Sequence, residues 1–397
     1  MREKLLGFLE KDFVNIISPV FEVKVKMILF LFLVLASVLT LFYGGYYLFG
    51  FFYGKQIRYN GDDTYFPRVS IVIATYNEEE LIGKKIENIV NLDYPKDLIE
   101  LIFVDSSADN TVQIIKEFKE KSSINAIIVE EKARKGLASA LNLGYSTATG
   151  EIVIKSDCDM PLKEDAVKEL VKYFSNTNVG AVTGPVVITS KSNVEKGYRS
   201  IFERLRLAEA NLDSTYLFNP LCAFRKDLIE PIDAKSVADD AELALKIRKK
   251  GFRTLYSPNA IAYESSPVTI GERIKQKSRR AQGHIRLIFQ NLSVMFNPKY
   301  GKFGFVIFPA NFFMMILSPW LILCTVILGL LSIGIFLGNL VMVLCSILFV
   351  LMTVLVYVTS KPMILAGFID AQVNLIVGLF KLVAKGPEFM WSKERRQ

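Results

Sequence analysis

The chain has 397 residues, of which 51% are hydrophobic and 22% are charged, and its formal net charge is +8. Two long stretches without a charged side chain, 27–54 and 303–360, exclude a purely soluble single domain, because about 20 consecutive apolar residues suffice to span a membrane. A single histidine and four scattered cysteines leave no strong case for Ser-His-Asp catalysis, a poly-histidine metal site or a disulfide framework. The basic balance fits attraction to anionic lipid headgroups, and no nucleic-acid-binding pattern accompanies it.

The N-terminal region, 1–60, predicts two helical segments. In residues 1–24 apolar side chains recur at helical spacing but are interrupted by charges, which is typical of a helix lying in the membrane interface. Residues 27–52 predict a membrane-spanning helix. This segment is too long for the core of a signal peptide and no cleavage-site pattern follows it, so it is interpreted as a retained anchor.

Residues 61–292 have the mixed composition of one large domain with its own core. Short runs rich in β-branched and apolar residues predict strands at 69–75, 98–105, 124–130, 151–155 and 179–188. Helical patterns occur at 78–90, 110–119, 137–145, 163–175, 195–211 and 239–250, and a basic amphipathic helix is predicted at 270–290. This alternation predicts an α/β domain whose parallel sheet is covered by helices on both faces and binds ligands at the carboxyl ends of its strands.

Residues 293–397 predict a C-terminal membrane region of two or three spans with a basic tail. The Gly338-Asn339 turn signal divides the second apolar stretch into two spans. Residues 362–384 are apolar but contain Asp370, Gln372 and Asn374, which fits either a third span or a helix in the membrane plane. The positive-inside rule places the basic tail in the cytoplasm and favours the in-plane helix, but it conflicts with a single N-terminal span, so the orientation of the termini stays open.

A pair of acidic residues, Asp157 and Asp159, follows the predicted strand 151–155. Two carboxylates at positions i and i+2 project to the same side of an extended chain. Together they could hold a hard divalent cation, which in turn neutralises a diphosphate. Such a pair also occurs in ordinary loops, so its meaning depends on the residues around it.

Further polar motifs mark the ends of the other predicted elements. In chain order they are Thr75-Tyr76-Asn77-Glu78 and Asp105 after the first two strands, Lys135-Gly136 before a small-residue helix, Asp239-Asp240 at a helix start, and Gln276-x-x-Arg279-Arg280 on the basic helix. This ordered set resembles family 2 glycosyltransferases of the GT-A fold. The flanking apolar helices resemble the membrane-integrated branch of that family, which includes cellulose, chitin, hyaluronan and poly-N-acetylglucosamine synthases.

The resemblance implies a donor-binding pocket at the ends of the first two strands. Tyr76 would stack on a uracil base, and Thr75 and Glu78 would line the nucleoside pocket. Asp105 would accept a hydrogen bond from the base, and Lys135 would lie near the base or the diphosphate. In the segment 104–111, Asp105 is a single aspartate at a point where many relatives have two, and the segment is one residue short, so this pocket is expected to differ in detail.

The resemblance also assigns the acidic residues and the basic helix. Asp157 would lie beside the ribose or the metal, and Asp159 would ligate Mg²⁺ or Mn²⁺. Asp240 matches the general base, with Asp239 standing where glutamate is usual. The diphosphate and the acceptor would meet a Gln-x-x-Arg-Trp motif, which is represented here by Gln276, Arg279 and Arg280.

Arg280 departs from that motif, because it replaces the tryptophan that forms part of the acceptor platform in polymerising relatives. The change removes an apolar stacking surface and adds a cation. A lipid-linked or phosphate-bearing acceptor, or a reaction without repeated elongation, therefore becomes more plausible.

The predicted function is inverting, metal-dependent transfer of a sugar from a nucleotide-sugar, expected to be UDP-linked, to a growing glycan or lipid-linked acceptor. The catalytic domain is expected on the cytoplasmic face of the cell membrane. Displacing a nucleoside diphosphate requires cationic groups at the leaving group and a carboxylate that takes the proton of the acceptor hydroxyl. Three or four helices make only a narrow channel, so a homo-oligomer or an accessory subunit is a further expected partner.

Two alternatives remain open at this point. The enzyme could add one sugar to a polyprenyl phosphate or a glycolipid and never elongate it. The chain could also be a non-catalytic membrane sensor or scaffold that binds nucleotide-sugars, although the intact carboxylates Asp157, Asp159 and Asp240 argue against this.

Overall fold

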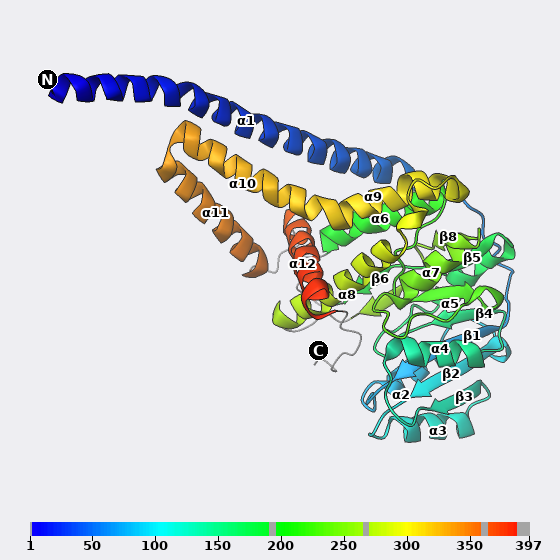
Figure 1. Cartoon of the computed structure of the whole chain (residues 1–397). Helices are drawn as coiled ribbons and strands as arrows, with labels where there is room; N and C mark the ends of the chain where they lie inside the picture. Colours follow the sequence, from blue (N-terminus) through cyan, green and yellow to red (C-terminus); the bar gives the residue numbers. More distant parts are fainter. Residues whose placement is uncertain (1, 190–195, 265–269, 359–363, 387–397) are drawn as a thin grey trace. The chain divides into compact units, whose positions relative to one another are not determined.

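The computed structural model describes residues 2–189, 196–264, 270–358 and 364–386 (Figure 1). Contacts within the chain divide it into two compact units. One unit joins Met1–Tyr46 to Phe313–Thr359 and consists of helices, and the other joins Tyr47–Phe312 to Ser360–Gln397 and contains the β-strands. The predicted basic tail, 387–397, lies outside the described residues.

Within the described residues, a seven-stranded sheet in the order β3-β2-β1-β4-β7-β5-β8 forms the centre of the second unit. Its strands are β1 (Val69–Thr75), β2 (Ile99–Asp105), β3 (Asn125–Glu130), β4 (Ile152–Lys155), β5 (Val179–Thr183), β7 (Cys222–Arg225) and β8 (Arg253–Tyr256). β1 to β4 are parallel to one another, and β7 runs antiparallel to its neighbours β4 and β5. The short strands β6 (Val186–Ile188) and β9 (Ala262–Glu264) pair in a separate two-stranded sheet.

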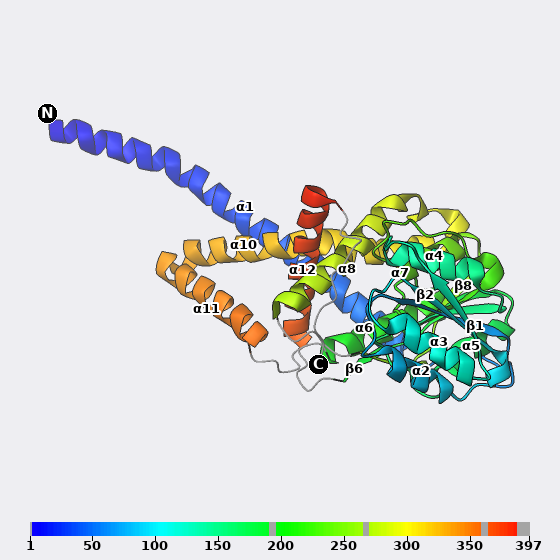
Figure 2. The same ribbon diagram turned by 90° about the horizontal axis from the view of Figure 1, so that it is seen from below.

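Both faces of the large sheet are covered by helices, because successive strand side chains point to opposite faces. One core includes the helices α2 (Ile82–Val90), α3 (Thr111–Lys121) and α5 (Ala166–Val171). The other core includes α4 (Leu137–Thr147) and α7 (Asp239–Lys249), and Figure 2 shows these two helices on the side of the sheet opposite α2, α3 and α5. Gly144 lets α4 pack directly on β1, since a Cβ there would lie 2.4 Å from Cγ1 of Val72.

The predicted α/β class, a sheet with helices on both faces, is confirmed, with two differences in detail. The predicted strand 179–188 is two strands, β5 and β6, which belong to different sheets. They separate at Gly184-Pro185, where a Cβ on Gly184 would lie 1.9 Å from the carbonyl oxygen of Ala260. The short strand β7 is antiparallel and carries no extended sequence pattern, so the sheet is mixed where the sequence predicts a parallel one.

The helical unit contains most of α1 (Arg2–Tyr53) together with α10 (Ser318–Leu337) and α11 (Asn339–Val358). α1 is one continuous helix where the sequence predicts an interfacial and a spanning segment. The predicted turn between α10 and α11 is confirmed, because Gly338 adopts a φ of +91°, which an L-residue rarely adopts. Inside this unit the rings of Phe42 and Phe313 lie 4.1 Å apart between centroids.

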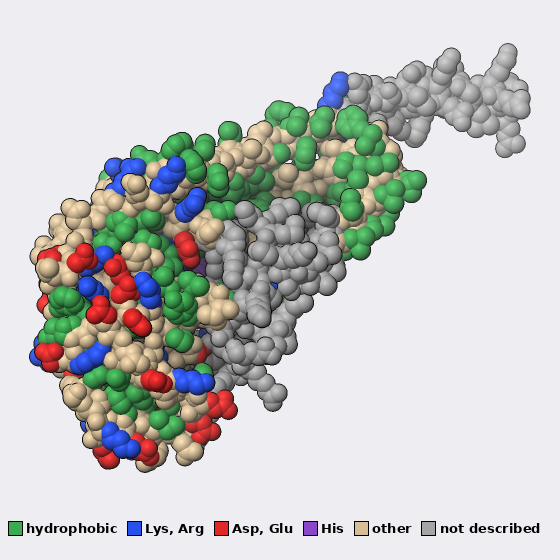
Figure 3. All heavy atoms as spheres, turned by 180° about the vertical axis from the view of Figure 1, so that it is seen from behind, with side chains coloured by type: hydrophobic (Ala, Val, Ile, Leu, Met, Phe, Trp, Pro, Cys, Tyr) green, Lys and Arg blue, Asp and Glu red, His purple; other side chains and the backbone are tan. Residues whose placement is uncertain are grey.

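Three helices among the described residues are long and apolar enough to cross a membrane: Val23–Tyr53, Phe303–Leu337 and Gly367–Lys385. Figure 3 shows hydrophobic side chains covering the described helices of the helical unit, whereas Lys, Arg, Asp and Glu gather on the unit with the sheet. An apolar surface of this kind fits insertion into a bilayer.

The helix α12 (Ile364–Lys385) packs against the basic helix α8 (Ile270–Gln290). Its three polar residues, Asp370, Gln372 and Asn374, are all buried. Lys277 of α8 forms an ion pair with Asp370, and the ammonium of Lys381 donates a hydrogen bond of 3.0 Å to Oγ of Ser278. The polar side of α12 is therefore sheltered by α8, while Phe380 and Val383 are exposed.

Candidate active site

The carboxyl ends of β1, β2 and β4 lie at one edge of the sheet, as parallel pairing requires. The register places Thr75 directly opposite Asp105. β4 ends at Lys155, and the loop that follows it carries Asp157 and Asp159, both half-buried. α7 begins at Asp239, so its first turn brings two further carboxylates to the same place.

A buried ion-pair cluster joins the end of β4 to the start of α7. Nζ of Lys155 lies 2.5 Å from a carboxylate oxygen of Asp239 and 3.8 Å from one of Asp240. The side chains of Lys155, Asp239 and Asp240 are 3%, 7% and 13% exposed. The negative charge of Asp157 acts on both Lys155 and Asp240. The cluster therefore brings Asp157, one of the two residues that the sequence assigns to metal binding, within electrostatic reach of Asp240, the predicted general base.

The surroundings of Asp240 leave its carboxylate unusually basic. Burial raises its pKa to about 6, with a further upward contribution from Asp239 and Asp157. Lys155 and the backbone N–H of Ala241, which donates a 2.8 Å hydrogen bond to Oδ1, act in the opposite direction. The closer partner of Lys155 is Asp239, and Asp240 lies further from the ammonium group.

Lys155 keeps its positive charge in spite of burial. Burial disfavours the ammonium form, but the charges of Asp239, Asp240 and Asp157 together hold its pKa well above the ordinary value. A charged lysine at this position offsets part of the repulsion among the three carboxylates.

Arg280 of α8 adds a cation beside these carboxylates. Its Nη2 lies 3.0 Å from Oε1 of the buried Glu264 in β9. The pKa of Arg280 is raised by Glu264 first and also by Asp240 and Asp157, which places the guanidinium within the electrostatic reach of the acidic cluster. Gln276 and Arg279 are half-buried on the same helix.

His284 is one turn further along α8 and is suited to remain neutral. Burial lowers its pKa to about 4, and the charges of Arg206 and Arg280 act in the same direction.

The acidic loop provides a partial set of metal ligands. Among the described residues, no cluster of three or more His, Cys, Asp and Glu side chains could hold a metal ion by itself. Asp157 and Asp159 offer two hard oxygen donors, and Mg²⁺ in proteins commonly takes one or two carboxylates and completes its coordination with substrate phosphates. The residues at this loop therefore fit a cation that is shared with a diphosphate.

The ends of β1 and β2 form a hydrogen-bonded pair of loops on the predicted nucleoside side. Thr75 Oγ1 donates to Asp105 Oδ2 at 2.5 Å, and the backbone N–H of Ser107 donates to Oδ1 at 2.7 Å. Ser107 Oγ also donates to Oδ2 at 2.8 Å, and Asp105 is only 2% exposed. The structure thus shows Asp105 binding the two loops together. Glu78 is likewise buried, and its N–H donates to Oγ1 of Thr111.

The aromatic ring of Tyr76 is half-buried and has a cation on its face. The guanidinium carbon of Arg134 lies 3.9 Å from the ring centroid, a distance typical of a cation–π contact. Lys135 is exposed, and its charge lowers the pKa of Glu131, which burial and Asp105 raise. Arg134, which sequence reasoning missed, is therefore the cation that touches Tyr76.

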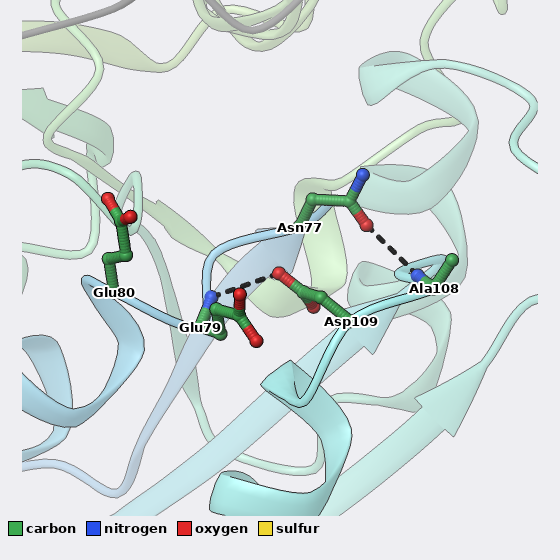
Figure 4. Close-up of a pocket in the computed structure, with 5 residues that line it drawn as sticks. All are labelled: Asn77, Glu79, Glu80, Ala108 and Asp109. Atoms are coloured by element: carbon green, nitrogen blue, oxygen red, sulfur yellow. Dashed lines mark hydrogen bonds between the residues drawn. The ribbon is translucent and has the colours of Figure 1, made fainter.

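A cavity of about 530 Å³ lies beside these loops and is lined by Asn77, Glu79, Glu80, Ala108 and Asp109 (Figure 4). The side-chain oxygen of Asn77 accepts a 2.9 Å hydrogen bond from the N–H of Ala108, and the N–H of Glu79 donates to Asp109 at 3.2 Å. Three acidic side chains in its wall disfavour a diphosphate at this point. The cluster around Lys155 and Arg280 is the better candidate for the reaction.

Sequence reasoning also missed the parts played by Lys155 and Glu264. A lysine that closes an otherwise apolar, buried strand is a signal for the first, because lysine is almost never fully buried unless it is paired. No local pattern points to Glu264, which meets Arg280 only in the folded chain.

Comparison with known proteins agrees with this geometry. Residues 70–232 match the family model described as Glycosyl transferase family 2, and residues 152–369, more than half of the chain, match Glycosyl transferase family group 2. The chain is 30% identical over 265 residues to the Probable glycosyltransferase YdaM of Bacillus subtilis (61% of each chain). It is 29% identical over 225 residues to the Poly-beta-1,6-N-acetyl-D-glucosamine synthase of Staphylococcus epidermidis (54% of each chain). Each match spans less than two thirds of the relative's length.

Among solved structures, the chain is similar to the mannosyltransferase PcManGT from Pyrobaculum calidifontis, with a TM-score of 0.74 and 26% sequence identity. The likeness covers 89% of this chain and 99% of that chain. That structure is a complex with GDP-Man and Mn²⁺.

Proposed function

This chain belongs to glycosyl transferase family group 2, and from that premise we propose that it transfers a sugar from a nucleotide-sugar to a glycan or lipid-linked acceptor at a membrane, with inversion of the anomeric carbon. The observation that carries the proposal is the pairing of Lys155 with Asp239 next to Asp240, whose pKa is raised by burial to about 6 and whose charge, like that of Asp157, acts on Arg280. The recognition of the family and of its GT-A fold from the sequence is confirmed.

Asp240 is proposed as the general base. A carboxylate with a pKa of about 6 is mostly ionised at neutral pH and still binds a proton well enough to take it from an attacking hydroxyl. As it gives this proton to Asp240, the acceptor hydroxyl oxygen attacks the anomeric carbon from the face opposite the nucleoside diphosphate. The new glycosidic bond forms as the bond to the diphosphate breaks, which inverts the anomeric centre. Asp239 supports this role by neutralising Lys155.

The leaving group is proposed to meet Arg279, Arg280 and Gln276 on α8. Guanidinium groups bind phosphate oxygens through charge-assisted hydrogen bonds, which become stronger as negative charge develops on the departing diphosphate. Asp157 and Asp159 are proposed to hold Mg²⁺ or Mn²⁺, which when bound supplies further positive charge to the diphosphate.

The nucleoside is proposed to bind at the ends of β1 and β2, where Tyr76 stacks on the base and Thr75, Glu78 and Asp105 shape the pocket. Lys135 would lie near the base or the diphosphate of the donor. Uridine is the predicted base, but the similar mannosyltransferase was solved with GDP-Man, so guanosine donors belong in any test.

The chain is proposed to be an integral membrane protein with its catalytic domain, 61–292, on the cytoplasmic side. The segments 1–60 and 293–397 are proposed as its membrane regions, which the three long apolar helices support. A homo-oligomer or an accessory subunit is proposed to complete any passage for the product.

Addition of one sugar to a polyprenyl phosphate or glycolipid is the second candidate, and Arg280 favours it. A half-exposed guanidinium beside the base suits an acceptor that carries a phosphate.

The test incubates the purified full chain with UDP- and GDP-sugars, Mg²⁺ or Mn²⁺ and either a polyprenyl phosphate or membrane glycolipids. Release of the nucleoside diphosphate with a sugar-bearing product supports the proposal. A ladder of products indicates elongation, and a single new lipid indicates the second candidate. Nucleotide-sugar binding without release or transfer across the panel would instead favour the sensor or scaffold hypothesis.

Removal of divalent metal is expected to lower transfer sharply, because two carboxylates and a diphosphate would then face one another without a bridging cation. Transfer is measured after chelation with EDTA and again after Mg²⁺ or Mn²⁺ is restored in excess. Recovery by either ion is the expected result, and full activity in the chelated protein would contradict the metal assignment.

The turnover number is expected to fall as pH drops through about 6, because protonated Asp240 cannot accept the hydroxyl proton. Below this pH the rate should decrease about tenfold per pH unit, and it should level off above it. Asp239→Asn should shift this loss of turnover to lower pH. The substitution removes a negative charge beside Asp240 and leaves Lys155 free to pair with Asp240, and both changes lower the pKa of Asp240. A flat wild-type profile between pH 5 and 7 would contradict the role of Asp240.

A further inference from the structure

Lys85 is a buried lysine on the sheet-facing side of α2. It is 2% exposed and shares that side with Ile82, Ile86 and Ile89. Removing an ammonium group from water is costly unless hydrogen bonds or opposite charges compensate for it. The position of this group therefore calls for a specific set of partners.

Those partners are the two ends of the acidic loop. Nζ of Lys85 donates a 2.7 Å hydrogen bond to Oγ of Ser156 and a 2.6 Å hydrogen bond to the carbonyl oxygen of Met160. Ser156 precedes Asp157, and Met160 follows Asp159. A single ammonium thus connects the residues that flank both carboxylates.

The positive charge of Lys85 stabilises the negatively charged acidic loop. Both hydrogen-bond acceptors are neutral, so these two bonds leave the positive charge of Lys85 to act on nearby carboxylates. The charges of Asp157 and Lys85 attract each other across the loop. Lys85 thereby offsets part of the repulsion between two aspartates that are separated by one residue.

α2 also forms hydrogen bonds with Leu162, which follows the acidic loop. Asn88, one turn after Lys85, donates to the carbonyl oxygen of Leu162 and accepts from its N–H, both at 2.8 Å. Together with the Lys85 bonds, these contacts fasten the segment 156–162 to one helix face at three residues. α2 therefore holds the acidic loop at both of its ends.

We propose that Lys85 is a positioning residue that holds the acidic loop in the orientation that lets Asp157 and Asp159 bind a cation and the donor diphosphate. This inference rests on the proposed function, because it takes those two carboxylates as the metal-facing residues. Residues that orient metal ligands commonly change metal affinity by about 10- to 100-fold when they are replaced.

The test uses the full chain in nanodiscs and compares Lys85→Met with wild type in two measurements. Hydrogen exchange of the peptide that contains residues 156–160, recorded without metal, should be faster in the variant. Binding of Mn²⁺ in the presence of UDP or GDP, followed by the electron paramagnetic resonance signal of free Mn²⁺, should weaken by about tenfold or more.

Lys96→Met is the matched control. Lys96 is partly buried and, like Lys85, donates to a backbone carbonyl, that of Leu92, but it precedes β2 and so lies toward the opposite edge of the sheet. The Lys96→Met variant should show wild-type hydrogen exchange in residues 156–160 and wild-type affinity for Mn²⁺. Ser156→Ala, which removes one of the two hydrogen bonds, should show a smaller change in the same direction and serves if Lys85→Met does not fold.

Unchanged loop exchange in Lys85→Met, or unchanged Mn²⁺ affinity where wild type binds the ion, would overturn the role of Lys85. An equal effect of Lys96→Met would also overturn it, because general loss of stability would then explain both variants. Wild-type protein that takes up no Mn²⁺ with either nucleotide would contradict the proposed function instead. The exchange measurement would then decide the positioning role by itself.

Discussion

Replacing Asp240 with asparagine is expected to lower sugar transfer by about 100- to 10,000-fold, the usual contribution of a general base. The amide keeps the size of the side chain but cannot take a proton from the acceptor hydroxyl. The fold should survive, because Lys155 retains its closer partner Asp239 at 2.5 Å. The measurement is the initial rate of nucleoside diphosphate release at saturating donor, with the melting temperature recorded in parallel.

Asp227→Asn is the matched control for this variant. Asp227 is an exposed aspartate in the short helix Lys226–Leu228, and it has no part in the proposed site. Its activity should stay close to that of wild type. Near-normal turnover by Asp240→Asn would refute the assignment of the base, whereas unfolding of that variant would show that Asp240 contributes to stability more than its distance from Lys155 implies.

Replacing Lys155 with methionine is expected to destabilise the domain by about 3–5 kcal/mol, the typical cost of leaving a buried charge without its partner. The variant leaves Asp239 and Asp240 together at the end of β4 with no ammonium between them. For a domain of this size the melting temperature should fall by roughly 10 °C. Thermal unfolding in detergent measures the effect, and transfer activity should be lost with it.

The double variant Lys155→Met/Asp239→Asn tests whether Lys155 stabilises the domain through its charge or through its packing. Removing the second charge should restore much of the lost stability, since the remaining carboxyl of Asp240 can stay protonated at mildly acidic pH. Activity should not return, because the base then lacks its charged surroundings. Equal melting temperatures for the single and double variants would show that Lys155 acts through packing alone.

The elements that the sequence predicted well are those with strong local patterns. The strands β1 to β4 and the helices α4, α6 (Lys196–Leu212), α7 and α8 occur within a few residues of their predicted bounds, because hydrophobic periodicity and helix-start signals lie within the segments themselves. The strands β7, β8 and β9 were missed because their three or four residues carry no apolar, β-branched run like that of β4. Their extended form depends on neighbours that are distant in sequence.

For the candidate site, too, the sequence predicts what local patterns carry and misses contacts between distant segments. The positions of Asp157 after a strand and of Asp239 at a helix start could be predicted, since ligands bind where parallel strands end. The partners of these residues could not. Arg134 lies over the ring of Tyr76, and Glu264 pairs with Arg280. Each contact joins segments that are distant in the sequence, so no local pattern predicts it.

By itself, the sequence determined the class of this protein: apolar stretches that suit a membrane, an α/β domain between them, and an ordered set of acidic and basic motifs typical of one enzyme family. Only the tertiary structure decided which charges compensate one another. Lys155 pairs with Asp239 across 84 residues of chain, and burial beside this pair raises the pKa of Asp240 to about 6. Hydrophobic patterning acts over a few residues and is visible in the chain, whereas the balance of buried charges depends on distances of a few ångströms that exist only after folding.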